Sequence, residues 1–177
     1  MAASAIANLG FLGPFLVGLP AFVRQVLGGD ASLFGVLLAA FGGGSLLGAI
    51  IAGRIRHWRQ GRTTAVGLGV AATALGLVST ADSLGWALGI LAIGGVGSGL
   101  ANVQLTVLLQ LRSDPSMVGR IMSLLLFGSF ALAPISQVGA GAIVEAGGPQ
   151  LVFVVGACIS LVGIAGAAPA LRQADAA

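Results

Sequence analysis

The chain has 177 residues, of which 57% are apolar and a further 30 are glycine, while only 7% are charged. A soluble domain carries about 25% charged residues, so this chain lacks the polar groups that a water-exposed surface requires. Disordered chains are charged and poor in large apolar residues, so the composition excludes disorder as well. The net charge of +3 comes from arginines placed between long apolar stretches. We therefore expect a lipid bilayer, and no nucleic acid, as the chain's surroundings.

Six uncharged stretches are long enough to cross a membrane. A helix needs about 20 apolar residues to cross the hydrocarbon core, and its backbone groups must bond within the helix itself. Strands of a membrane barrel would need an alternating pattern, which the chain lacks. We predict an all-α, polytopic membrane protein in which residues 1–177 form a single six-helix transmembrane bundle. The expected spans are about 4–23, 31–53, 63–81, 84–110, 121–144 and 150–171.

The arginines predict the orientation of the bundle. Of the eight, only Arg24 lies in an odd-numbered connection between spans. The other seven lie in even-numbered connections or near the C-terminus. Because short arginine-rich connections stay in the cytoplasm, we predict that both termini are cytoplasmic.

A short repeat relates the two halves of the chain. The second span ends with Gly48-Ala49-Ile50-Ile51, and the fifth ends with Gly141-Ala142-Ile143-Val144. These spans occupy equivalent places in two three-helix halves but cross the membrane in opposite directions. Inverted repeats of this kind are found in secondary transporters. We therefore predict that the bundle consists of two inverted three-helix repeats.

Small residues recur at a spacing of four within several predicted spans. They form the pairs Gly85/Gly89 and Gly95/Gly99 and, in the second span, Gly44/Gly48 followed by Ala52. In lipid, small residues at this spacing let two helix backbones approach closely and gain van der Waals contact. We therefore predict that these pairs lie at helix–helix contacts.

Two predicted spans carry polar and aromatic residues at helical spacing. In the fourth span these residues share a face with Gly95 and Gly99, and in the fifth with Ser123 and Pro134. An amide in hydrocarbon needs a hydrogen-bond partner, so each face either bonds to other helices or lines the path of a small-molecule substrate. Both interpretations are open from the sequence. The candidate path residues are Asn102, Thr106, Gln110, Phe127, Phe130 and Gln137.

The first predicted span contains Pro14 and Pro20. Proline lacks the N–H that a helix interior requires, and membrane helices tolerate it where neighbouring groups replace the lost bond. We therefore predict that the first span is interrupted and able to bend.

The predicted spans contain no Asp, Glu or His. Proton-coupled carriers usually hold an acidic residue in the membrane, so a coupling residue lies elsewhere or does not exist. An intramembrane protease would need a histidine or paired aspartates beside a serine such as Ser98. We therefore expect that the chain is not an enzyme and holds no metal and no cofactor.

Three segments carry a likeness to a known family. The first span reads Gly13-Pro14 and then Gly18-Leu19-Pro20, residues 48–62 form a glycine- and arginine-rich connection, and Pro115 is followed by Gly119-Arg120-Ile121-Met122-Ser123. Together they resemble the C-terminal half of a major facilitator superfamily transporter, and more narrowly the bacterial group of siderophore and macrolide exporters. They are similar to its seventh helix and to its loops between helices eight and nine and between helices ten and eleven. The matching loop residues are Gly53, Arg54, Gly61, Arg62, Pro115, Gly119 and Arg120.

This resemblance implies a function. It implies secondary active transport, with efflux of small amphiphilic organic molecules, across the bacterial plasma (inner) membrane. The loops would gate the cytoplasmic side, although His57 and Trp58 stand where the first loop motif often has an acidic residue. Because alternating access needs one half to rock against another, we expect a second transporter half as a partner, either a second copy or a separate N-terminal half.

Two other interpretations use the same residues. The chain is compatible with a truncated or inactive transporter fragment, which keeps the helices but performs no transport. It is also compatible with a six-helix structural or assembly protein of the membrane, for which the small-residue packing positions alone would be sufficient.

Overall fold

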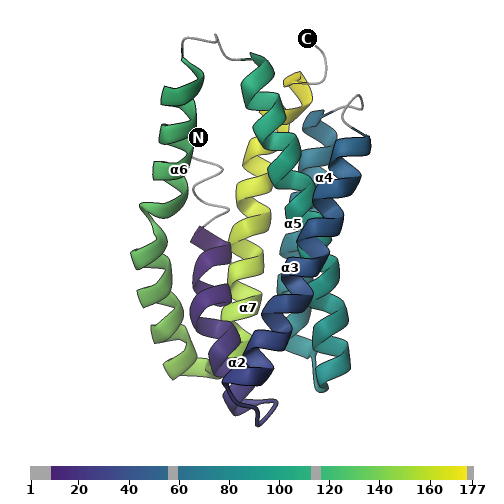
Figure 1. Cartoon of the computed structure of the whole chain (residues 1–177). Helices are drawn as coiled ribbons and strands as arrows, with labels where there is room; N and C mark the ends of the chain where they lie inside the picture. Colours follow the sequence, from purple (N-terminus) through teal and green to yellow (C-terminus); the bar gives the residue numbers. More distant parts are fainter. Residues whose placement is uncertain (1–8, 56–59, 113–116, 175–177) are drawn as a thin grey trace.

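The computed structural model describes residues 9–55, 60–112 and 117–174. Within these ranges the regular structure is helical throughout, and no strand is present. The helices lie side by side along one axis, as Figure 1 shows. This arrangement confirms the predicted fold class, an all-α bundle of apolar helices.

The first described element is an apolar helix, Leu9–Gln25, called the first helix below. It includes the π-helical turn η1, Pro14–Gly18, and the α-helix α2, Leu19–Gln25. The elements that follow are α3 (Ala31–Arg54), α4 (Gln60–Leu77), the 3-10 turn η2 (Val78–Thr80), α5 (Leu84–Arg112), α6 (Val118–Phe130) and α7 (Ala133–Ala174). By length and composition, four helical stretches among the described residues could cross a membrane, and the first helix is shorter.

The long helix α7 is broken at Gly148, so that it consists of two helices. Gly148 has φ 80° and ψ 172°, which is not a helical conformation. Pro149 follows it, and a proline both lacks an N–H and disfavours helical geometry in the residue before it. The break falls between the predicted fifth and sixth spans, and residues 133–147 continue the direction of α6 (Figure 1).

Glycines allow α3 and α5 to cross at backbone contact. A Cβ atom on Gly48 would collide with the carbonyl oxygen of Val96, and one on Gly95 would collide with that of Phe41. The predicted packing role of Gly44/Gly48 and Gly95/Gly99 is therefore confirmed. The same prediction is wrong for Gly85 and Gly89, because nothing lies within 4 Å of a Cβ built on either residue.

Two pairs of helix contacts repeat with the same chemistry, as an inverted repeat requires. Gly67 of α4 meets Gly97 of α5, and Gly10 of the first helix meets Gly156 of α7. Likewise, Ser45 of α3 lies against Gly99 of α5, and Ser136 of α7 lies against Gly13 of the first helix. All four contacts join one of the first three predicted spans to one of the last three, and in each pair the two halves exchange places.

The main hydrophobic core lies towards one end of the bundle. It includes the fully buried side chains of Leu19, Phe22, Leu37 and Val78, and the ring of Phe153, which packs edge-on against Phe22 at 5.7 Å. These residues lie near the turn between α2 and α3 and the turn between η2 and α5. The ends of α3 and α5 and the starts of α4 and α6 are at the opposite end, where α6 stands apart from α5 (Figure 1).

Candidate functional site

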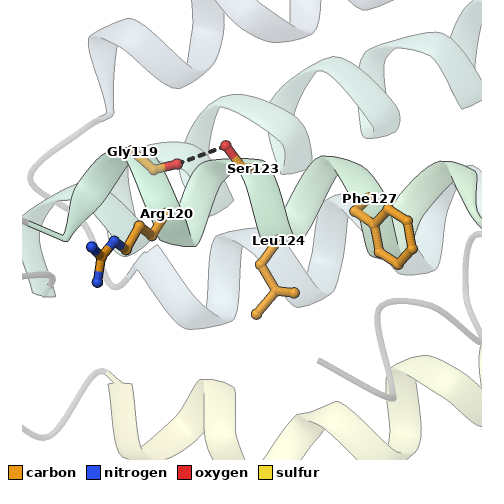
Figure 2. Close-up of a pocket in the computed structure, with 5 residues that line it drawn as sticks. All are labelled: Gly119, Arg120, Ser123, Leu124 and Phe127. Atoms are coloured by element: carbon orange, nitrogen blue, oxygen red, sulfur yellow. Dashed lines mark hydrogen bonds between the residues drawn. The ribbon is translucent and has the colours of Figure 1, made fainter.

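A shallow, wide-open pocket of about 610 Å³, called the groove below, runs along the N-terminal part of α6 (Figure 2). It lies at the end of the bundle where α3 and α5 end and α4 and α6 begin (Figure 1). Five described residues line the groove, all of them on α6: Gly119, Arg120, Ser123, Leu124 and Phe127.

One face of α6 supplies both polar and apolar groups to the groove. Arg120, Leu124 and Phe127 are separated by four and three residues, the spacing that places side chains on one helix face. In Figure 2 these three side chains extend to the same side of α6, while Ser123 donates a hydrogen bond to the carbonyl oxygen of Gly119 at 3.0 Å. Leu124 is 52% exposed and Phe127 is 70% exposed. The face therefore offers a positive charge next to an uncovered apolar surface.

The guanidinium group of Arg120 forms no ion pair with another described residue. An arginine side chain stays charged at any physiological pH and presents several N–H donors in one plane. These donors are exposed at the groove. The charge at this end of the groove is therefore available to a molecule that enters it.

The polar face predicted on α5 is open along its C-terminal half. Asn102 and Gln110 are exposed and Thr106 is half-buried. The amide of Asn102 donates to the carbonyl oxygen of Ser98 at 3.0 Å, and the Thr106 hydroxyl donates to that of Asn102 at 2.8 Å. These hydrogen bonds lie within α5 and do not join it to another helix.

The crossing of α3 explains why this face is half covered. α3 lies over Gly95 and Gly99 and then passes to the other side of α5, where Ala52 meets Gln104. Residues Asn102 and Thr106, which continue the face of Gly95 and Gly99, are left uncovered as a result. This chain therefore presents two open faces at one end, one on α5 and one on α6.

Gln104 is a buried polar residue that the sequence interpretation missed. Its side chain is 1% exposed, its Nε2 donates to the carbonyl oxygen of Ala52 at 3.3 Å, and its Oε1 has no hydrogen-bond partner. Ala52 belongs to the last turn of α3, directly before Gly53 and Arg54. The sequence feature that could have revealed Gln104 is its position two residues after Asn102. At that spacing its side chain lies on the opposite, apolar face of the helix.

The loop-motif residues lie at helix ends, and the candidate path residues are divided between helices. At the end of α3, Gly53 and Arg54 are exposed. At the start of α4, Gly61 is buried and Arg62 is exposed. In the first turn of α6, Gly119 and Arg120 are exposed. Phe127 lies in the groove, and Gln137 is half-buried on α7. Pro115 and the side chain of Phe130 lie outside the described part of the structure.

Comparison with known protein families identifies the family of this chain. The profile of the Major Facilitator Superfamily matches residues 1–176, almost the entire chain. No curated protein and no solved structure matches the chain significantly. The family match confirms the resemblance at the level of the superfamily. The chain therefore belongs to the Major Facilitator Superfamily of membrane transporters.

Proposed function

We propose that the chain is one six-helix half of a secondary active transporter that exports small amphiphilic organic molecules. The groove on α6 is the observation that carries this proposal. Arg120 and Ser123 give it polar groups, while Leu124 and Phe127 give it an uncovered apolar surface. A molecule with a polar group and an apolar body fits both kinds of surface at once, because binding sites combine apolar walls with a few polar contacts.

The exposed amides of α5 support a second transporter half as the partner. Asn102 and Gln110 are exposed in this chain, and an amide facing lipid is unfavourable because hydrocarbon offers no hydrogen bonds. A watery cavity between two halves would solvate both amides. The partner in this proposal is a second copy of the chain or a separately encoded N-terminal half, which rocks against it.

The proposed location is the bacterial plasma membrane, with both termini in the cytoplasm. The ends of α3, α5 and α7 and the starts of α4 and α6 all lie at one end of the bundle (Figure 1). Arg54, Arg62 and Arg120 are at this end, whereas Arg24 is at the other. The positive-inside rule places the arginine-rich end in the cytoplasm.

Dye transport in proteoliposomes tests the proposal. The purified chain is reconstituted and flux is followed with ethidium as a cation, Nile red as a neutral dye and anilinonaphthalene sulfonate as an anion. At least one dye should be moved, and Arg120→Gln and Phe127→Ala should each lower its flux severalfold. Arg24→Gln, at the other end, and Val162→Ala, an exposed residue of α7, are the matched controls. A chain that stays monomeric and moves none of the dyes contradicts transport by two copies of the chain, and leaves the separately encoded N-terminal half and the fragment interpretation.

A further inference from the structure

A single hydroxyl group joins α7 to one turn of the first helix. The Oγ of Ser136 accepts a hydrogen bond from the N–H of Gly13 at 2.8 Å and donates to the carbonyl oxygen of Leu9 at 2.5 Å. Leu9 and Gly13 are four residues apart, and an α-helix bonds such a pair directly. The hydroxyl of a distant residue therefore gives both backbone groups of this pair a second partner.

This turn comes directly before the weakest part of the first helix. Pro14 has no N–H to offer to the carbonyl of Gly10, and its ring disturbs the turn before it. The chain then widens into the π-helical turn Pro14–Gly18, in which the N–H of Leu19 reaches the carbonyl oxygen of Pro14. Helices bend where a proline, a π-turn or an inserted side chain interrupts the ladder of hydrogen bonds. All three occur here within a few residues.

Both parts of the first helix contact α7, but the part after the π-turn supplies the fully buried core residues. After the π-turn, Leu19, Phe22 and Val23 belong to the hydrophobic core. Before it, Gly10 packs against α7, where a Cβ on Gly10 would lie 2.6 Å from the carbonyl oxygen of Gly156. α7 contacts the first part at Gly156 and the second at Phe153, so a change of angle between the two parts falls in the stretch from Gly13 to Gly18, where the ladder of hydrogen bonds is interrupted.

We propose that Ser136 is a positioning residue that makes this turn a bending point of the first helix. When the turn opens, the hydroxyl keeps the Gly13 N–H and the Leu9 carbonyl hydrogen-bonded, and when it closes they bond to each other. Gly13 is buried and Ser136 is 8% exposed, so water does not replace the hydroxyl. Unpartnered backbone groups are strongly unfavourable inside a membrane. Because one partner replaces the other, both groups stay hydrogen-bonded in the open and in the closed turn. The use of this bend in alternating access rests on the proposed function.

The contact between α3 and α5 provides a comparison for this arrangement, because it also places a serine against a glycine. Ser45 of α3 lies against Gly99 of α5 as Ser136 lies against Gly13. No proline occurs between Leu84 and Arg112, and the structure gives the Ser45 hydroxyl no hydrogen bond to the described part of α5. A serine is thus present at both contacts. It bridges a turn of the neighbouring helix only in the first helix, where Pro14 follows that turn.

Amide hydrogen exchange at Gly13 tests the bending point, measured by NMR on the full chain in detergent micelles. Ser136→Ala should raise the exchange rate about tenfold, the factor expected when one hydrogen bond no longer protects a local opening. Ser45→Ala should leave the Gly13 exchange rate within about twofold of wild type. Ser136→Thr, which keeps the hydroxyl, should leave it within about threefold of wild type. In a Pro14→Ala background the effect of Ser136→Ala should shrink, because the ladder is restored.

The proposal is overturned if Ser136→Ala leaves the Gly13 rate unchanged, or if Ser45→Ala raises it equally. The transport part has its own readout. With a dye that the wild-type chain moves, Ser136→Ala should lower the maximal flux severalfold and leave the half-saturating dye concentration unchanged, since Ser136 does not line the groove. Equal flux in both proteins overturns the link to transport. A wild-type chain without flux contradicts transport by two copies of the chain, and the exchange rates still decide the bending point.

Discussion

Gln104 of α5 donates a hydrogen bond to the carbonyl oxygen of Ala52 in the last turn of α3, although 52 residues separate them. The amide nitrogen thereby partners one of the terminal carbonyls that a helix end leaves without an intrahelical donor. It also attaches the end of α3, and with it Gly53 and Arg54, to α5. The other amide atom, Oε1, remains buried without a partner.

Two substitutions of Gln104 should differ in their effect on stability. Gln104→Leu loses a hydrogen bond worth about 1 kcal/mol but also removes a buried unpaired oxygen that costs about 1–3 kcal/mol. We therefore expect its free energy of unfolding to stay within about 1 kcal/mol of wild type. Gln104→Ala leaves a cavity as well and should destabilise by about 2–4 kcal/mol. Unfolding in mixed micelles measures both, and equal losses for Leu and Ala would contradict the argument.

Glycine-to-alanine changes on α3 should have opposite signs at two positions. Gly42 is exposed and has nothing within 4 Å of a built Cβ, so Gly42→Ala should stabilise the helix by about 0.5–1 kcal/mol. Gly48→Ala would place its methyl group against the backbone of Val96 and should destabilise by about 1–3 kcal/mol. Thermal unfolding of the two variants provides the comparison. A stabilising Gly48→Ala would mean that α3 and α5 do not cross at this contact.

The polar face of α5 should contribute to transport and not to folding. Asn102 bonds to its own helix and Gln110 is exposed, so Asn102→Leu and Gln110→Leu should change the unfolding free energy by no more than about 0.5 kcal/mol. If the face lines the substrate path, each should lower dye flux in proteoliposomes. Unchanged flux together with a large loss of stability would instead favour a role in helix association.

The Asp30 cap of α3 predicts a dependence on acid. Its carboxylate accepts hydrogen bonds from the Ser32 hydroxyl at 2.6 Å, the Leu33 N–H at 3.2 Å and the Ser32 N–H at 3.0 Å. The Ser32 hydroxyl bond, followed by the bond from Leu33, lowers the pKa of Asp30 below its ordinary value. A lowered folded-state pKa stabilises the fold above the ordinary pKa, and this contribution is lost as the pH falls through the folded value. Thermal unfolding should therefore lose stability on acidification, and Asp30→Ala should remove this part of the loss.

The orientation is testable by labelling from one side of the membrane. In a Cys158→Ala background, single cysteines replace Met117, in the connection before α6, or Ser83, in the connection before α5. Both positions are exposed. If the arginine-rich end is cytoplasmic, a membrane-impermeant maleimide added to intact cells should label Ser83→Cys and not Met117→Cys. The reverse pattern would place both termini outside.

Sequence alone determined the class of this protein. The length of the apolar stretches and the positions of the arginines act locally, because the bilayer demands a helix wherever about 20 apolar residues follow one another. The same local reasoning anticipated the interruption of the first helix, since Pro14 lacks its N–H in any surroundings. The three segments that resemble the family could also be recognised in the sequence as short motifs.

Only the tertiary structure decided which face each helix covers. The spacing of Gly85/Gly89 equals that of Gly44/Gly48, yet only the second pair meets a neighbouring backbone. The crossing of α3 over α5 covers Gly95 and leaves Asn102 open. Gln104 and Ser136 bond to residues 52 and more than 120 positions away. Periodicity tells which residues share a face of a helix, but the neighbour of that face depends on how the helices cross, and crossing is a property of the packed bundle.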